Sequence, residues 1–291
     1  MQEDIQYMDS LRKKASQGML IIIPLIFLAF ISVYINPILF IGVIVAIVVV
    51  YKKKVSKNRK EYRAYYKDVF VKKMILQAIP DAVYEPNQGF ERSMISGTGL
   101  MSMGNVYASE DYIRGTFNGV SFERADVVIE DESTDSEGHT TTTTYLRGRW
   151  MVFESNKTFQ GDLQIVQKGF NFANKRKGLF TRKADRRHVF KTEDELFNKE
   201  FQCLCQDEAE AFYLLTPGVM QGLMRLAQAM DGKIMVGFVD NRMHVAVNSK
   251  KDSLEPPWRT ITDADINEVT REINAITSFV VSMNLDRKIF L

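Results

Sequence analysis

The longest apolar run of the chain extends from Met19 to Tyr51 and contains no charged side chain. One straight helix of this length, at about 1.5 Å per residue, would exceed the roughly 30 Å hydrocarbon core of a bilayer. Asn36-Pro37 lies near the middle of the run, where the proline removes a backbone donor and disfavours helical angles in the residue before it. The pattern therefore predicts a transmembrane helical hairpin over residues 19–51.

The second helix of this hairpin, from about Ile38 to Tyr51, is shorter than an ordinary spanning helix of roughly 17–25 residues. Snorkelling lysines after Tyr51, a locally thinner bilayer or association into a homo-oligomer would each relieve the mismatch. A re-entrant hairpin that does not cross the bilayer is the alternative interpretation.

Basic side chains flank the apolar run on both sides, with Arg12, Lys13 and Lys14 before it and several lysines between 52 and 60 after it. Lysine and arginine are in excess on the cytoplasmic side of membrane proteins. A hairpin satisfies this bias at both ends, so we expect a multi-pass protein of the bacterial cytoplasmic (inner) membrane. The N-terminal segment 1–18, both termini and the main domain would then lie in the cytosol.

Residues 52–80 predict a basic juxtamembrane helix, because apolar side chains recur at helical spacing and neither glycine nor proline occurs before Pro80. Its basic side chains would attract anionic lipid, at roughly 1 kcal/mol per charge near the surface. The competing interpretation is a topology signal on a solvated helix face.

Residues 81–291 predict one cytosolic α+β domain of antiparallel strands with several helices. Short alternating segments indicate strands at 95–103, 112–117, 120–128, 150–154, 163–167, 201–205, 233–239 and 242–247. Helical spacing and capping residues indicate helices at 192–199, 208–215, 218–230 and 263–283. Asn118-Gly119 is typical of a tight hairpin turn, and Asp240-Asn241 marks another.

Two polar segments interrupt this domain. Residues 130–144 are acidic and then rich in threonine, so they bury little apolar surface and predict a mobile loop at a hairpin tip. Residues 174–188 form a basic loop around Leu179 and Phe180, which suits a bilayer surface or an acidic protein, or else is simply solvated. The candidate lipid or partner contacts are the basic residues of the juxtamembrane helix and of this loop: Lys52, Lys53, Lys54, Lys57, Arg59, Lys60, Lys175, Arg176, Lys177, Arg182, Lys183, Arg186 and Arg187.

Six segments carry a resemblance to a known family. They are ISGTGLM at 95–101, EDYIRGTFNGVSFERADV at 110–127, GRWMVFESNKTFQGDLQIV at 148–166, EAFYLLTPGVMQGL at 210–223, KIMVGFVDNRMHVAV at 233–247 and MNLDRKIF at 283–290. In this order, after the charge-free hairpin and the basic helix, they resemble a bacterial membrane-protein family known as domain of unknown function number 3137. The resemblance implies a membrane protein with a cytoplasmic domain, often accompanied by LemA-type membrane proteins, and no established reaction.

The sequence contains no recognisable catalytic or metal-binding pattern. Its three histidines, His139, His188 and His244, are far apart, and none of the common phosphate-loop, serine-hydrolase or zinc-protease motifs occurs. Cys203 and Cys205 would share one face of a strand without an easy disulfide, which fits a reducing compartment. We therefore expect neither an enzyme nor a cofactor, and the net charge of +2 argues against nucleic-acid binding.

Three classes of function stay open at this stage. The leading hypothesis is a membrane-anchored cytosolic interaction or scaffold module in a membrane protein assembly, because an anchor and a folded domain occur without a chemical signature. The alternative is an anionic-lipid or small-ligand binding domain, motivated by the two basic segments. An uncharacterised enzyme is the third class and would require a pocket with convergent polar groups.

Overall fold

The computed structural model describes residues 2–154, 162–171, 187–252, 254–283 and 285. The chain divides into two compact units. The N-terminal unit comprises Met1–Met74 with Leu254–Thr270, and the sheet unit comprises Ile75–Ser253 with Arg271–Leu291. The segment 254–270 thus belongs with the N-terminal helices and not with the domain that the sequence predicted from residue 81 onward.

Helices make up the N-terminal part of the chain. In order they are α1 (Gln2–Ile35), α2 (Pro37–Val50), the π-helical turn η1 (Tyr51–Ser56), α3 (Lys57–Tyr65), the π-helical turn η2 (Tyr66–Val71) and α4 (Lys72–Ala78). Asn36 has extended angles and interrupts the helices, and its side chain accepts a hydrogen bond from the Ile38 N–H at 2.8 Å. The expected break at Asn36-Pro37 is therefore present, and Asn36 also caps the next helix.

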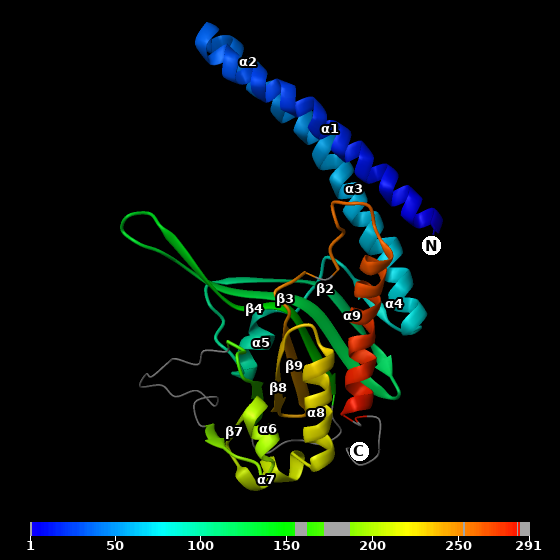
Figure 1. Cartoon of the computed structure of the whole chain (residues 1–291), viewed down its shortest axis with the longest axis vertical. Helices are drawn as coiled ribbons and strands as arrows, with labels where there is room; N and C mark the ends of the chain where they lie inside the picture. The colour runs from blue at the N-terminus through cyan, green and yellow to red at the C-terminus, as the bar shows by residue number, and fades with distance from the viewer. Residues whose placement is uncertain (1, 155–161, 172–186, 253, 284, 286–291) are drawn as a thin grey trace. The chain divides into compact units, whose positions relative to one another are not determined.

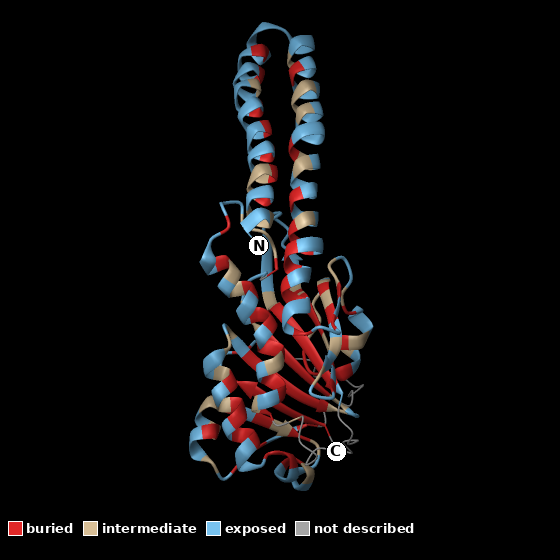
Figure 2. Ribbon diagram, turned by 90° about the vertical axis from the view of Figure 1, so that its right-hand side faces the viewer, coloured by how far each residue is buried: buried red, intermediate tan, exposed pale blue. Residues whose placement is uncertain are grey.

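One face of α1 is buried at a regular spacing of three and four residues: Met8, Leu11, Ala15, Gly18, Ile22, Ala29 and Ser32. A side chain at Gly18 would come within 2.9 Å of Val55 Cγ2, so this seam lies against the helical run that follows α2. α1 and the helical run from α2 through α3 lie side by side (Figure 2). The spacing is that of two packed helices, since residues three and four apart share a helix face.

The rest of the α1 and α2 surface is apolar and exposed. Between Met19 and Tyr51, 20 large hydrophobic side chains are exposed, among them Phe27 and Phe30 at 69% each. Within the described residues, α1 is the one helix long and apolar enough to cross a membrane, whereas α2 has 14 residues.

The described strands of the sheet unit form one nine-stranded antiparallel sheet with the order β1-β2-β3-β4-β9-β8-β5-β7-β6. The strands are β1 (Val83–Glu85), β2 (Val106–Phe117), β3 (Val120–Thr134), β4 (Thr140–Glu154), β5 (Leu163–Gln167), β6 (His188–Phe190), β7 (Phe201–Cys205), β8 (Lys233–Val239) and β9 (Arg242–Asn248). The β2–β3 turn has positive φ at Asn118 and Gly119, and the β8–β9 turn has positive φ at Asp240. Both hairpins predicted from these turn residues are confirmed.

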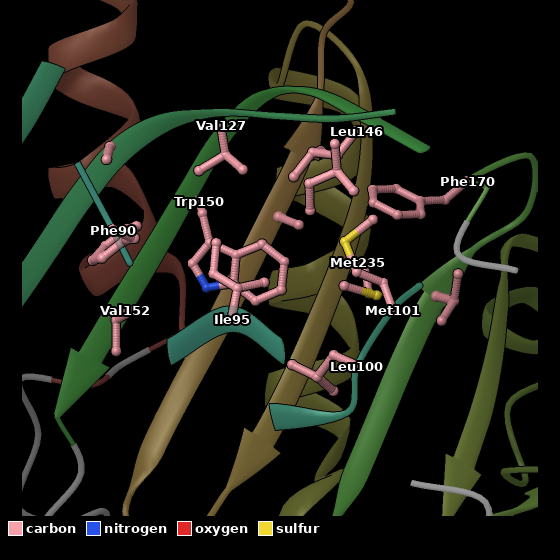
Figure 3. Close-up of a cluster of buried hydrophobic side chains, with 14 residues drawn as sticks. Phe90, Ile95, Leu100, Met101, Val127, Leu146, Trp150, Val152, Phe170 and Met235 are labelled. Atoms are coloured by element: carbon pink, nitrogen blue, oxygen red, sulfur yellow. The ribbon is translucent and has the colours of Figure 1, made fainter. Parts of the chain in front are cut away.

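Helices cover both faces of the sheet (Figure 1). They are α5 (Arg92–Thr98), α6 (Glu195–Glu200), α7 (Glu208–Leu214), α8 (Pro217–Ala229) and α9 (Asp263–Ser282). On the face covered by α5, Trp150 is fully buried among Ile95, Leu100 and Met235 (Figure 3). On the other face, Phe153 stacks on Phe279 of α9 with ring centroids 4.8 Å apart.

Two local predictions were wrong. Residues 95–103 were expected as a strand, but α5 occupies 92–98 and ends at Gly99, whose φ of 63° terminates a helix readily. Residues 130–144 were expected as a loop, but β3 and β4 stay paired as far as Thr134 and Thr140. Threonine is β-branched and favours strands, so the turn at the hairpin tip is much shorter than predicted.

Candidate functional site

The candidate basic residues fall into three groups. Lys52, Lys53, Lys54, Lys57, Arg59 and Lys60 are exposed on η1 and α3. Lys175, Arg176, Lys177, Arg182, Lys183 and Arg186 lie outside the described residues. Arg187 is described and is buried.

Arg187 makes contacts inside the sheet unit. Its guanidinium pairs with Asp162 at 3.0 Å and donates to the carbonyl oxygens of Thr98 at 3.2 Å and Gly99 at 3.1 Å. A guanidinium is well suited to the unpaired carbonyls at a helix C-terminus. Arg187 therefore fixes the end of α5, and it does not belong to an exposed basic surface.

A pocket of about 260 Å³ lies in the N-terminal unit, between α3 and the segment that precedes α9 (Figure 1, orange). It is lined by Arg59, Tyr62, Arg63, Glu255, Pro256 and Trp258. All six residues belong to the same compact unit. We refer to it as the α3 pocket.

Helical spacing places Arg59, Tyr62 and Arg63 on one side of α3, because residues three and four apart share a face. The Tyr62 hydroxyl donates a hydrogen bond to the Pro257 carbonyl oxygen at 2.8 Å, which ties the segment to the helix. Burial raises the pKa of Tyr62 to about 12, so this hydroxyl keeps its proton. The Trp258 ring lies 6.0 Å from the Tyr62 ring, and the Arg59 guanidinium lies over it, 4.6 Å from its centroid.

Ion pairs of Glu255 lie beside the α3 pocket. Glu255 accepts hydrogen bonds from Arg63 Nε at 2.8 Å and Nη2 at 2.5 Å, and its carboxylate lies 2.5 Å from Lys67 Nζ. Although burial raises the pKa of Glu255, the bonds from Arg63 and Lys67 hold it below its usual value. Among the described residues, no carboxylate pairs with Arg59, whose guanidinium lies over the Trp258 ring.

A second group of charges is buried in the sheet unit, on the face that α9 covers. Arg124 and Asp126 on β3, Arg149 on β4 and Glu272 on α9 are all almost inaccessible to solvent. Arg124 Nη2 lies 2.8 Å from Asp126 Oδ1, and Arg149 pairs directly with Glu272. Within the described chain, Asp126 Oδ2 and Arg149 Nε have no hydrogen-bond partner. We refer to these four residues as the buried ionic cluster.

Burial raises the pKa of Asp126 to about 7, and the nearby carboxylates of Asp111 and Asp252 add to this against the opposing effect of Arg124 and Arg149. A carboxyl group with such a pKa is a feature of some active sites, but structural ion pairs also produce it. None of the four residues lines the α3 pocket. Its clearest role is to attach α9 to the sheet.

Cys205, His188 and Glu208 are close together but do not form a nucleophilic triad. Cys205 Sγ at 4.0 Å and Glu208 Oε1 at 3.0 Å both face the same nitrogen, His188 Nε2. In a triad the base uses one nitrogen for the nucleophile and the other for the orienting acid. Burial also raises the pKa of Cys205 to about 11, so the thiol stays protonated at neutral pH.

His244 on β9 is buried in the core, and its ring has a hydrogen-bond partner. Its Nδ1 accepts a hydrogen bond from Trp150 Nε1 at 3.2 Å. Burial lowers the pKa of His244 to about 4, so the ring is neutral at physiological pH.

Sequence reasoning identified Arg59 but missed the α3 pocket, because Glu255 and Trp258 are almost 200 residues from α3 along the chain. The one available signal was Pro256-Pro257-Trp258, an exposed aromatic after two prolines.

Residues 144–285 match a family model whose description is "Protein of unknown function (DUF3137)". This part of the chain is a DUF3137 domain. The match confirms the family resemblance, and the segments at 148–166, 210–223 and 233–247 lie within it. The membrane and LemA parts of that resemblance stay predictions. The DUF3137 region extends from β4 to α9, and so contains Arg149 and Glu272 of the buried ionic cluster as well as Glu255 and Trp258 of the α3 pocket.

Outside the DUF3137 family, the comparisons are weak. No curated protein matches the chain. Among solved structures, the chain is similar to the crystal structure of the mycobacterial trehalose monomycolate transport factor A, TtfA, with a TM-score of 0.39 and 10% sequence identity. That similarity covers 73% of this chain and 93% of TtfA. At this TM-score and identity, it supports no inference about the function of this protein.

Proposed function

We propose that this protein is a membrane-anchored, non-catalytic interaction module of a bacterial inner membrane. In this proposal α1 and α2 form a transmembrane hairpin, and the DUF3137 domain works as a scaffold at the cytosolic surface. A LemA-type membrane protein, suggested by the family resemblance, is the first partner to test, and a second copy of the chain is another.

The hairpin is supported chiefly by contacts between the residues that precede the apolar segment and those that follow it. Asp4 near the start of α1 accepts a hydrogen bond from the Tyr65 hydroxyl at 3.2 Å and lies 3.3 Å from Lys73 Nζ. The Tyr7 and Tyr65 rings are in edge contact, with centroids 4.6 Å apart. Because these contacts join residues on either side of the apolar run, they favour both flanks on one side of the membrane.

The exposed surface of the two helices supports a lipid environment. Patches of exposed apolar surface larger than a few hundred Å² are rare on soluble monomers, yet 20 large hydrophobic side chains are exposed between Met19 and Tyr51. The 14 residues of α2 extend only about 21 Å as a helix, short of the roughly 30 Å core. Lys52, Lys53 and Lys54 continue the helix and can snorkel to the headgroups, which relieves this mismatch.

Labelling of single introduced cysteines in intact cells tests the topology. Tyr34, 91% exposed beside the α1–α2 break, is replaced in Tyr34→Cys, and Lys60→Cys introduces a thiol beyond the helices. A membrane-impermeant maleimide should label only Tyr34→Cys in intact cells and both variants after lysis. The parent protein is the control, because Cys203 and Cys205 are buried.

Two results would contradict the hairpin. Labelling of Lys60→Cys in intact cells would place the DUF3137 domain outside the cytosol. Protection of Tyr34→Cys before lysis would favour the re-entrant arrangement.

Anionic-lipid binding is the second candidate function, and the exposed lysines of η1 and α3 favour it. Each basic side chain near an anionic surface contributes about 1 kcal/mol. The full-length protein, reconstituted in nanodiscs, should therefore show slower hydrogen exchange over residues 52–60 in phosphatidylglycerol than in phosphatidylcholine. Equal exchange in both lipids would exclude this second function.

A further inference from the structure

We infer that Trp258 inserts into the lipid headgroup layer and anchors the segment 254–262, which precedes α9, to the bilayer surface beside α3. The inference rests on the proposed membrane hairpin for the position of the bilayer, and it adds a second contact between the protein and lipid. This contact depends on an aromatic ring and not on lipid charge, so it is distinct from the attraction of exposed lysines to anionic lipid.

The segment runs along α3 towards the apolar helices (Figure 1, orange). Its contacts with η2 and α3 move steadily towards the N-terminal end of the helical run, in the order Glu255 with Lys67, Pro257 with Tyr62 and Trp258 with Arg59. Thr260 then crosses to α1, where its Oγ1 accepts a hydrogen bond from Arg12 Nη2 at 3.1 Å. Of the contacts with α3, that of Trp258 is therefore the nearest to the apolar run.

The packing of the two helices indicates where the hydrocarbon core ends. A Cβ at Gly18 would lie 2.9 Å from Val55 Cγ2, so these two residues are at the same level. Gly18 directly precedes Met19, the first residue of the charge-free run. The helical run from Pro37 to Val55 is about 28 Å long, close to the roughly 30 Å core. The edge of the core thus lies near Gly18 and Val55, and the lysines at 52–54 snorkel outwards from just inside it.

This edge places Trp258 at the level of the lipid headgroups. Arg59 follows Val55 by four positions, which is about 6 Å along the helix. The headgroup layer is about 5–8 Å thick on each side of the core. The Trp258 ring lies under the Arg59 guanidinium, with 4.6 Å between that group and the ring centroid. Tryptophan is enriched in this layer, because its ring is apolar and its N–H is polar.

Trp258 is exposed and held in position. Its exposed fraction is 47%, whereas tryptophan is highly buried on average in folded proteins. Pro256 and Pro257 restrict the backbone directly before it, and the hydrogen bond from the Tyr62 hydroxyl to the Pro257 carbonyl oxygen ties the segment to α3. A ring that is already positioned loses less conformational freedom when it inserts, which favours insertion.

Depth-dependent quenching of tryptophan emission tests the anchor. The full-length protein is reconstituted in phosphatidylcholine nanodiscs whose lipids carry a nitroxide either on the headgroup or near the end of an acyl chain. Trp258 emission is the signal of the parent less that of Trp258→Phe, because the other tryptophan, Trp150, is buried in the core of the sheet unit. Phosphatidylcholine carries no net charge, so attraction of the lysines to anionic lipid does not contribute.

Tyr7→Trp in the Trp258→Phe background is the matched control. Tyr7 is 50% exposed, close to the 47% of Trp258, and it belongs to the same compact unit. It precedes Gly18 by eleven positions, about 16 Å along α1, which is beyond the headgroup layer. Since a nitroxide quenches only at short range, the control separates a ring in the headgroup layer from an exposed ring in water.

We expect the headgroup nitroxide to quench most of the Trp258 emission, and to quench it more than the chain-end nitroxide does. The Tyr7→Trp control should keep most of its added emission with both lipids. Trp258 emission that neither nitroxide quenches would overturn the inference. Stronger quenching by the chain-end nitroxide would also overturn it, and so would equal quenching of Trp258 and of the Tyr7→Trp control.

None of these results affects the hairpin, whose failure appears separately as maleimide labelling of Lys60→Cys in intact cells. Melting temperatures of Trp258→Phe and of the Tyr7→Trp control that equal that of the parent confirm that the fold is intact.

Discussion

Removing the charge of Glu272 should destabilise the sheet unit more than any surface substitution. Glu272 on α9 pairs with Arg149 and lies 3.8 Å from Arg124 Nη2, and all three side chains are buried. In Glu272→Gln the size is kept, but both guanidinium groups lose a buried carboxylate partner. Breaking a buried ion pair by removing one partner costs about 3–5 kcal/mol, because the remaining charge stays buried and unpaired.

The expected effect on thermal stability follows from this energy. A domain of roughly 150–250 residues loses about 2–4 °C of Tm for each kcal/mol, so Glu272→Gln should melt about 10 °C lower. The double variant Arg149→Met with Glu272→Met removes both charges and leaves apolar side chains. It should recover most of the loss, since an apolar replacement of a buried pair is often neutral or stabilising.

The assay uses the full-length protein in mild detergent and follows the emission of Trp150, which is packed in the core of the sheet unit. A Trp258→Phe background makes Trp150 the sole reporter. Glu193→Gln, an exposed acid in the same unit, is the matched control and should change stability by less than about 0.5 kcal/mol. The reasoning is refuted if Glu272→Gln has the same Tm as the control. It is also refuted if the double variant loses as much Tm as Arg149→Met and Glu272→Met lose together.

Two further predictions concern the same face of the sheet. Since the folded protein holds the Asp126 proton up to about pH 7 and the unfolded chain loses it near 3.8, stability attributable to Asp126 should fall as pH rises from about 4 to about 7. The Tm of Asp126→Asn relative to the parent should therefore rise between pH 5 and pH 8, and a constant difference would contradict the prediction. The contribution of His244 to stability rises with pH, and it cancels in this difference because both proteins contain His244. Gly222→Ala should lower the free energy of unfolding by about 1–3 kcal/mol, because the new Cβ would clash with the Ser282 carbonyl oxygen. The control is Gly218→Ala in the same helix, where the new Cβ meets nothing closer than 3.9 Å. Thermal melting should show this control to be neutral or stabilising.

Much of the sheet unit could be predicted from local pattern. Strands β5, β7 and β8 begin and end where the alternation of apolar residues indicated, at 163–167, 201–205 and 233–239. Thr216, which precedes Pro217, caps α8 by accepting a hydrogen bond from the Val219 N–H. Alternation and capping are properties of neighbouring residues, so they are visible without knowledge of the tertiary fold.

The errors arose where distant residues decide the structure. The glycines of 95–103 suggested strand ends, but Ile95 and Leu100 are buried against the sheet, and the last glycine before Leu100 ends α5. The α3 pocket could not be predicted, because it depends on Glu255 and Trp258 packing against a helix far away in the sequence. Such contacts leave no periodic signal in either segment.

The buried ionic cluster shows why alternation alone can mislead about a sheet face. Arg124 and Asp126 alternate with Ala125 and Val127, a pattern that indicates a solvated face opposite a core. That face is instead covered by α9, whose buried carboxylate Glu272 meets the guanidinium groups of the sheet.

An apolar helix can slide along an apolar sheet at little cost, but moving α9 by one turn would separate Glu272 from Arg149 and leave both charges buried. We therefore expect the cluster to set the register of α9 rather than to add net stability. In the Arg149→Met and Glu272→Met double variant, the Tm should stay close to that of the parent, while hydrogen exchange along α9 becomes faster. Unchanged exchange on α9 would show that apolar packing, including the stacked Phe153 and Phe279, suffices to hold the register.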